Sequence, residues 1–223
     1  MNFLPAHRLR LYRNFKAIES HDFHGLIRFY EQFEEDIRAL DFEEYFDCTQ
    51  AYTLALFHTG NYGKHVVMCD HLLELIIMHN IDTWGGEDVY AKTLFLKAAS
   101  LFQQQEYPHA EHVLRELVKI YPSDRVPCRF LEKCLLRQRP SWLMKTRGAT
   151  VGLVLLSAAV IAVELFVVTP FHEAWIDPVR LLRNVLLGLD IGVFVTGELT
   201  HALRCRYAAG AFAKKMFCRK YKA

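Results

Sequence analysis

The sequence predicts an all-α fold: a stack of helix hairpins over residues 1–138, a transmembrane helical hairpin over 139–203 and a basic tail over 204–223. Three observations support this prediction. Apolar residues in the first part recur at helical spacing, and no stretch alternates as a strand does. Residues that break helices separate these apolar runs. Residues 149–169 then form one apolar run that holds a single charge.

Net charge divides the chain at the same place as hydropathy. Residues 1–136 carry 14 Lys/Arg and 20 Asp/Glu, a net of −6, whereas residues 137–223 carry 13 and 5, a net of +8. Nucleic-acid binding is disfavoured, because contact with phosphates needs Lys and Arg on the soluble surface. None of the six cysteines forms a C-x-x-C pair, and we expect reduced thiols in a cytosolic domain.

The helix breakers in the first part recur at intervals that suggest an internal repeat. They are Gly60-Asn61, Trp84-Gly85-Gly86, Tyr107-Pro108 and Tyr121-Pro122. In three places a polar residue and an aromatic residue open a new helix: Asp22-Phe23, Asn61-Tyr62 and Glu106-Tyr107. The aromatic residues lie 39 and 45 residues apart, which is close to the period of a helix pair.

The unit from Leu94 to Pro122 resembles a tetratricopeptide (TPR) repeat. The residues that match the family pattern are Ala98, Tyr107, Ala110, Leu114 and Pro122. In the preceding unit Gly60 and Tyr62 also match, but His65 and Cys69 stand where Ala and a bulky aromatic are usual. The resemblance covers roughly residues 10–135 and implies a concave groove that binds peptides or helices.

A final helix from Asp124 to Gln138 is predicted to close this stack. It places Phe130, Leu131, Cys134 and Leu135 on one stripe, with Asp124 as its N-cap. A closing helix is needed because each hairpin buries its apolar face only against a neighbour.

The first predicted span is 149–169, which is long enough to cross about 30 Å of hydrocarbon and is ended by Pro170. A turn containing Trp175 leads to a second span at about 184–203. Lys and Arg gather before the first span and after the second, so both termini are expected on the cytoplasmic side. The membrane is a bacterial inner membrane or that of an organelle.

Polar residues inside the predicted spans are the sharpest candidate site. Glu164 and Asp190 are placed at a similar depth, where they could face each other, and two carboxylates that close would share a proton. The second span carries one polar stripe, formed by Arg183, Asp190, Gly197, Glu198 and His201. This stripe is interpreted as a contact with a membrane subunit or a second copy, or as a seam sealed within the hairpin. Gly188 and Gly192 form a G-x-x-x-G on the opposite face, where a partner helix could pack.

No catalytic, cofactor or metal site is predicted, and the chain is not expected to be an enzyme. The pairs His65/Cys69 and His109/His112 lack further ligands at a metal-binding spacing. Residues 31–47 hold eight acidic side chains against one Arg38, which is interpreted as a solvated face or as a dock for a basic segment.

These features predict a membrane-anchored scaffold or adaptor that binds protein partners through its helical domain. The alternative is an accessory subunit of a larger membrane complex, assembled through the polar stripe of the second span. A proton- or ion-conducting oligomer is the third hypothesis. Anionic lipid is a further expected partner, at the basic tail.

Overall fold

The computed structural model describes residues 4–138, 140–168 and 176–222. The chain forms two compact units, Met1–Cys134 with Met216–Ala223, and Leu135–Lys215. The N-terminal helices are α1 (Leu4–Lys16), α2 (Phe23–Gln32), α3 (Glu34–Arg38), α4 (Phe42–His58), α5 (Tyr62–Met78), α6 (Val89–Gln103), α7 (Tyr107–Ile120) and α8 (Arg125–Arg137). The C-terminal elements are α9 (Ser141–Val163), the π-helix η1 (Glu164–Val168) and α11 (Ile176–Lys222). The all-α prediction is therefore confirmed.

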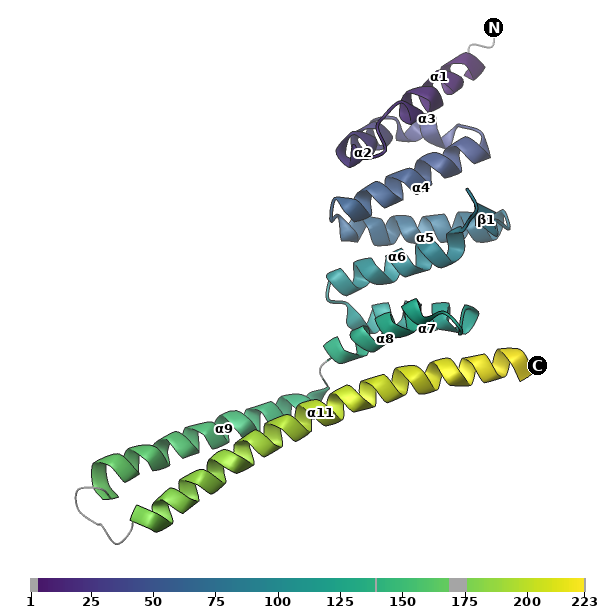
Figure 1. Ribbon diagram of the computed structural model, residues 1–223. Coiled ribbons are helices and arrows are strands. Elements are labelled where there is room, and N and C mark those ends of the chain that lie inside the picture. Colours follow the sequence, from purple (N-terminus) through teal and green to yellow (C-terminus); the bar gives the residue numbers. More distant parts are fainter. Residues whose placement is uncertain (1–3, 139, 169–175, 223) are drawn as a thin grey trace. The chain divides into compact units, whose positions relative to one another are not determined.

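Helices α4 to α7 stack in chain order, each packed on the one before it, and α2 packs on α4 (Figure 1). Most of the buried side chains of the first unit lie at these contacts. The arrangement follows from the predicted pattern, because each helix is apolar on the faces that meet its neighbours.

Two turns of the stack have the same geometry. Gly60, after α4, and Gln105, after α6, both have a left-handed backbone, with φ of +77° and +64°. The next residue, Asn61 or Glu106, donates its backbone N–H to a carbonyl five residues back, at 3.0 Å in both turns. This is the Schellman ending of a helix. The turns lie 45 residues apart, so the hairpins α4–α5 and α6–α7 repeat one local structure.

The connection between α5 and α6 contains a short antiparallel strand pair rather than a simple turn. Strands β1 (Thr83–Trp84) and β2 (Glu87–Asp88) pair across Gly85 and Gly86. Both glycines have positive φ, +60° and +83°, as the tightest hairpin turns require. The Trp84 ring packs edge-on against Phe46 at 4.8 Å, which fixes the strand pair against the helices.

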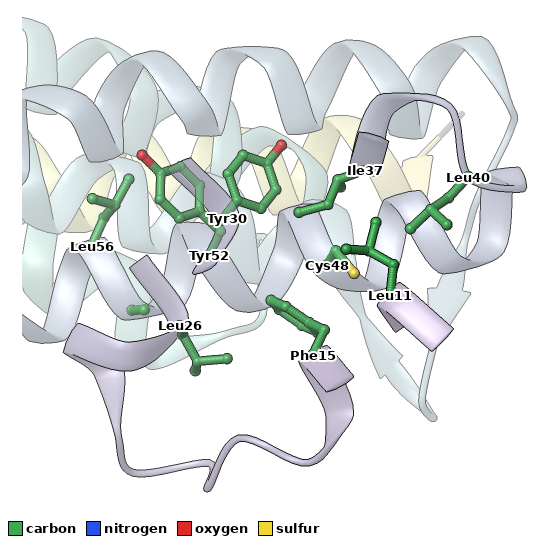
Figure 2. Close-up of a cluster of buried hydrophobic side chains, with 10 residues drawn as sticks. Leu11, Phe15, Leu26, Tyr30, Ile37, Leu40, Cys48, Tyr52 and Leu56 are labelled. Carbon is green, nitrogen blue, oxygen red and sulfur yellow. The ribbon is translucent and has the colours of Figure 1, made fainter. Parts of the chain in front are cut away.

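The N-terminal end of the first unit has its own hydrophobic core (Figure 2). It joins α1, α2, the segment around α3 and α4 through Leu11, Phe15, Leu26, Tyr30, Ile37, Leu40, Cys48, Tyr52, Ala55 and Leu56. The rings of Tyr30 and Tyr52 stack at 4.1 Å, and burial raises the pKa of Tyr30 to about 12. Helix α1 is thus part of the domain core rather than a free arm.

In the second unit, α9 and α11 run antiparallel, tied by ion pairs near both ends of α9. Arg147 contacts Glu198 at 2.5 Å, and Arg183 contacts Glu164 at 2.9 Å. Helix α11 continues without a break from Ile176 to Lys222, so the predicted second span and tail belong to one helix.

Among the described residues, one helix, Ser141–Phe166, is long and apolar enough to cross a membrane. This supports the first predicted span; the second is not confirmed in this way. Pro170 and Trp175, predicted as the terminator of the first span and as part of the interfacial turn, lie outside the described residues.

Candidate functional site

The predicted repeat residues occupy packing positions in the hairpins. Ala98, Ala110 and Leu114 are fully buried between α6 and α7. Pro122 is also buried, just after α7. The Tyr107 ring lies against Phe102 at 5.3 Å, and the Tyr62 ring lies against Phe57 at 6.0 Å in the equivalent turn. These residues therefore position the helices that form the site.

His65 departs from the repeat pattern because it forms a buried polar contact between α5 and α6. Its Nδ1 lies 2.7 Å from Ser100 Oγ, and both residues are 0% exposed. The Cys69 sulfur lies 3.6 and 3.4 Å from the two ring nitrogens. Nearly equal distances mean that the sulfur sits beside the ring rather than in line with one nitrogen.

The burial of the His65–Cys69–Ser100 cluster does not favour a nucleophilic site. Burial lowers the pKa of His65 to about 4 and raises the pKa of Cys69 to about 12. A reactive cysteine needs the opposite, a stabilised thiolate beside a cationic group. The cluster is therefore a neutral structural contact.

A surface hollow of about 210 Å³ lies across α4, α5 and α6. Its lining is Asp47, Gln50, Ala51, Thr53, Leu54, Cys69, Leu72, Lys92, Thr93 and Leu96. A second hollow, of about 420 Å³, lies across α6, α7 and α8 and is lined by Asp88, Ala91, Lys92, Phe95, Leu117, Tyr121, Asp124, Val126 and Pro127. Lys92 borders both, so the two hollows adjoin. We call the surface formed by both linings the groove.

The charged residues of the groove already have partners within the domain. Asp47 accepts a hydrogen bond from the Tyr12 hydroxyl at 3.0 Å and pairs with Lys16 at 2.5 Å. Lys92 pairs with Glu87. Asp88 caps α6 and accepts the Tyr121 hydroxyl, which raises the pKa of Tyr121 to about 12.

The same holds for three of the eight acidic residues in the segment 31–47. Glu31 binds Lys64 at 2.8 Å, and this contact lowers its pKa. Glu34 binds Arg38 at 2.5 Å, and Asp47 is bound as described above. The side chains left for recognition in the groove are mainly apolar, among them Leu54, Leu96 and Val126.

The polar stripe predicted on the second span faces α9 and is filled by it. Besides the two ion pairs, Gly197 faces Thr146: a Cβ atom at position 197 would lie 3.5 Å from the Thr146 hydroxyl oxygen. The rings of His201 and Trp142 have their centroids 6.0 Å apart. On α9, Thr150 and Ser157 are buried. We call this contact between α9–η1 and α11 the polar seam.

The structure gives Glu164 two cationic partners, Arg180 at 3.3 Å and Arg183 at 2.9 Å. A proton shared between Glu164 and Asp190 stays a prediction. Asp190 lies seven residues beyond Arg183, which is about 10 Å along a helix. Among the described residues, the buried Asp190 Oδ1 has no hydrogen-bond partner.

Gly188 and Gly192 lie away from the polar seam, on open surface, as expected for the opposite face of α11. Gly148 and Gly152 form a second G-x-x-x-G, on α9, and are equally open. The sequence analysis missed this pair, although the same four-residue spacing is the signal that would have found it.

Within the described part of the chain, no three His, Cys, Asp or Glu residues are grouped so that they could hold a metal ion. No family model, curated protein or solved structure matches this chain. The function is therefore inferred from the groove and the polar seam.

Proposed function

We propose that this protein is a membrane-anchored docking protein, in which the groove binds a segment of a protein partner. In this proposal α9–η1 and the first half of α11 cross the membrane as a hairpin. Both termini then lie on the cytoplasmic side, where the N-terminal domain meets its partners.

The observation that carries the membrane anchor is the inverted polarity of the α9–α11 pair. Its buried positions include Thr150, Ser157, Glu164 and His201. Large apolar side chains point outward from both helices: Val151, Val154, Leu155, Leu156 and Val163 on α9, and Leu182, Val185, Leu189, Ile191, Val195 and Leu199 on α11. Water disfavours this arrangement, whereas hydrocarbon favours it. The outward apolar face of α11 therefore supports a second span despite its charges.

The chemistry of the groove supports a peptide partner. Some of its apolar residues remain only half-buried in the folded domain, among them Leu54 on α4 and Leu96 on α6. Because the groove charges are already paired, an incoming segment gains most by burying its own apolar side chains. The TPR resemblance implies the same kind of partner.

An accessory subunit of a membrane complex is the second candidate. The polar seam is filled by the hairpin's own residues, so it offers little to another subunit. The open glycine pairs Gly188/Gly192 and Gly148/Gly152 favour this candidate, since close helix packing needs such small residues. A conducting oligomer is less supported, because the charges of the seam are engaged within it.

The test is crosslinking and mass spectrometry of the protein extracted gently from its native membrane. A Leu54→Arg/Leu96→Arg variant changes the groove, and Val67→Arg/Met78→Arg is the matched control on the exposed side of α5. We expect soluble partners to be lost only from the groove variant, with equal helix content in both variants.

Two membrane variants separate the alternatives. Retention of those soluble partners in Glu164→Leu/Asp190→Leu supports the docking proposal. A membrane partner that persists in the groove variant but disappears in Gly188→Ile/Gly192→Ile identifies an accessory subunit instead. Soluble partners that survive the groove variant contradict docking in the groove.

A further inference from the structure

The part of α11 beyond the predicted second span is basic and solvent-exposed. From Leu199 to the C-terminus the sequence has seven Lys or Arg and no Asp or Glu. The cations with described side chains are Arg204, Arg206, Lys214, Lys215, Arg219 and Lys220, and all are exposed. Positive charges this close together on one helix repel one another unless an anion from outside the chain lies near them.

Many cations elsewhere in the described chain pair with a carboxylate, although others, such as Arg125, Arg129 and Lys133 on α8, do not. In the N-terminal domain Lys16, Arg38, Lys64, Lys92, Lys97, Arg115 and Lys119 each pair with a carboxylate. In the polar seam Arg147, Arg180 and Arg183 do the same. Across the described residues, no carboxylate pairs with Arg204, Arg206, Lys214 or Lys215. Their counter-charge is therefore expected to come from outside the chain.

A contact with α9 indicates the depth at which this basic segment begins. The Arg204 guanidinium lies over the Trp142 ring, 5.5 Å from its centroid. Trp142 stands at the start of α9 and Arg204 directly after the second predicted span, so both mark the same end of the hairpin. Indole and guanidinium groups favour the headgroup region at the edge of the hydrocarbon.

The exposed face of α11 has a depression between these cations. The depression is lined by Leu203, Arg204, Arg206, Tyr207, Gly210, Ala211 and Lys214. The small residues Gly210 and Ala211 leave room between Arg204 and Lys214, which lie ten residues or about 15 Å apart along the helix. Tyr207, in the same depression, is 80% exposed, an unusual state for a large aromatic ring in water.

We propose that this basic depression binds the headgroup of an anionic phospholipid in the cytoplasmic leaflet. The cations at the border of the depression, Arg204, Arg206 and Lys214, supply the counter-charge of the phosphate, and Tyr207 lies between them at the glycerol level. The proposal rests on the hairpin crossing the membrane as described under the proposed function.

The test uses the full chain in a mild detergent, titrated with phosphatidylglycerol or phosphatidylcholine, with bound lipids counted by native mass spectrometry. We expect the wild type to bind phosphatidylglycerol on the order of tenfold more tightly. Arg204→Gln/Arg206→Gln/Lys214→Gln should abolish the preference, since each cation near a bilayer contributes about a fivefold factor. The charge-preserving Arg204→Lys/Arg206→Lys/Lys214→Arg should keep most of it.

A second triple variant, Arg125→Gln/Arg129→Gln/Lys133→Gln on the exposed side of α8, matches the change in net charge and should keep the preference. Equal binding of both lipids by the wild type, or an unchanged preference in the α11 triple variant, overturns the proposal. Displacement of phosphatidylglycerol by millimolar inorganic phosphate also overturns it, because the site then recognises a free anion. Membrane extraction at alkaline pH, run in parallel, reports separately whether the hairpin is inserted.

Discussion

Lowering the pH should destabilise the N-terminal domain through His65. Unfolded, its imidazole has a pKa near 6.5; folded, burial lowers the pKa to about 4. Between these values the unfolded chain binds the additional proton, so the free energy of unfolding falls as the pH falls. Below the folded pKa both states are protonated and the loss stops. A shift from 6.5 to 4 corresponds to about 3 kcal/mol, a large share of a domain's typical stability.

The assay is denaturant unfolding of the full chain in detergent, followed by helix content at pH 7 and near pH 4. His65→Leu removes the titration, but at pH 7 it loses the Ser100 contact, at about 1–3 kcal/mol. The variant should therefore be less stable than wild type at pH 7 and approach or exceed it at pH 4. The exposed His112→Leu is the control and should follow the wild type. A pH slope in His65→Leu as steep as in the wild type would refute the reasoning.

The same unfolding assay tests two turn substitutions. Gly60→Ala should destabilise the domain by about 1 kcal/mol, and Gln105→Gly should stabilise it by up to about 1 kcal/mol. Both positions have a left-handed backbone, which glycine adopts most readily. If both substitutions change the free energy of unfolding in the same direction, this reasoning is contradicted. In the polar seam, Asp190→Leu should leave the melting temperature in detergent unchanged or raised, since Asp190 Oδ1 has no partner among the described residues. Glu164→Leu should lower it by removing the partner of Arg183, and similar melting of both variants would count against the assigned pairing.

The helical stack could be predicted because its signals are local. The segments Asn61-Tyr62 and Glu106-Tyr107 each start a helix at the predicted residue, since turn geometry depends on only a few neighbouring residues. The same pattern did not reveal Gln105 as the left-handed residue that corresponds to Gly60. Glutamine has no propensity for that conformation, so the tertiary structure imposes it.

The candidate site was less predictable because it depends on which residues of separate helices meet. The groove is lined by residues of the five helices α4 to α8, and single-helix patterns do not show which side chains remain unpaired. His65 was noted as a departure from the repeat pattern and as half of an incomplete metal-binding pair with Cys69, but its contact with Ser100 was missed because the two residues lie 35 positions apart. The arginine partners of Glu164 could not be predicted, because counting from the span ends gives a depth but not the stagger between η1 and α11. The stagger places Arg183 against Glu164.

The charges of the polar seam explain why α11 has too low a hydropathy to be recognised as a membrane span when it is considered alone. The seam holds three cations and three acids: Arg147, Arg180, Arg183, Glu164, Asp190 and Glu198. Hydropathy treats each as an isolated charge, whereas the folded pair neutralises most of them across the two helices. Isolated charges are costly in hydrocarbon and paired ones much less so. The second span should therefore insert efficiently only together with the first.

Glycosylation mapping of the two spans can test this dependence. Residues 184–203 without α9 should insert poorly, and joining α9 should increase insertion by several-fold. Within the hairpin, Arg147→Leu should reduce insertion because it leaves Glu198 unpaired. Adding Glu198→Leu should restore insertion, since the double change removes both charges. Two results would contradict this reasoning: equal insertion of the second span with and without α9, or equal insertion of the single and double variants. Either would show that the ion pairs of the polar seam do not promote membrane insertion of the second span.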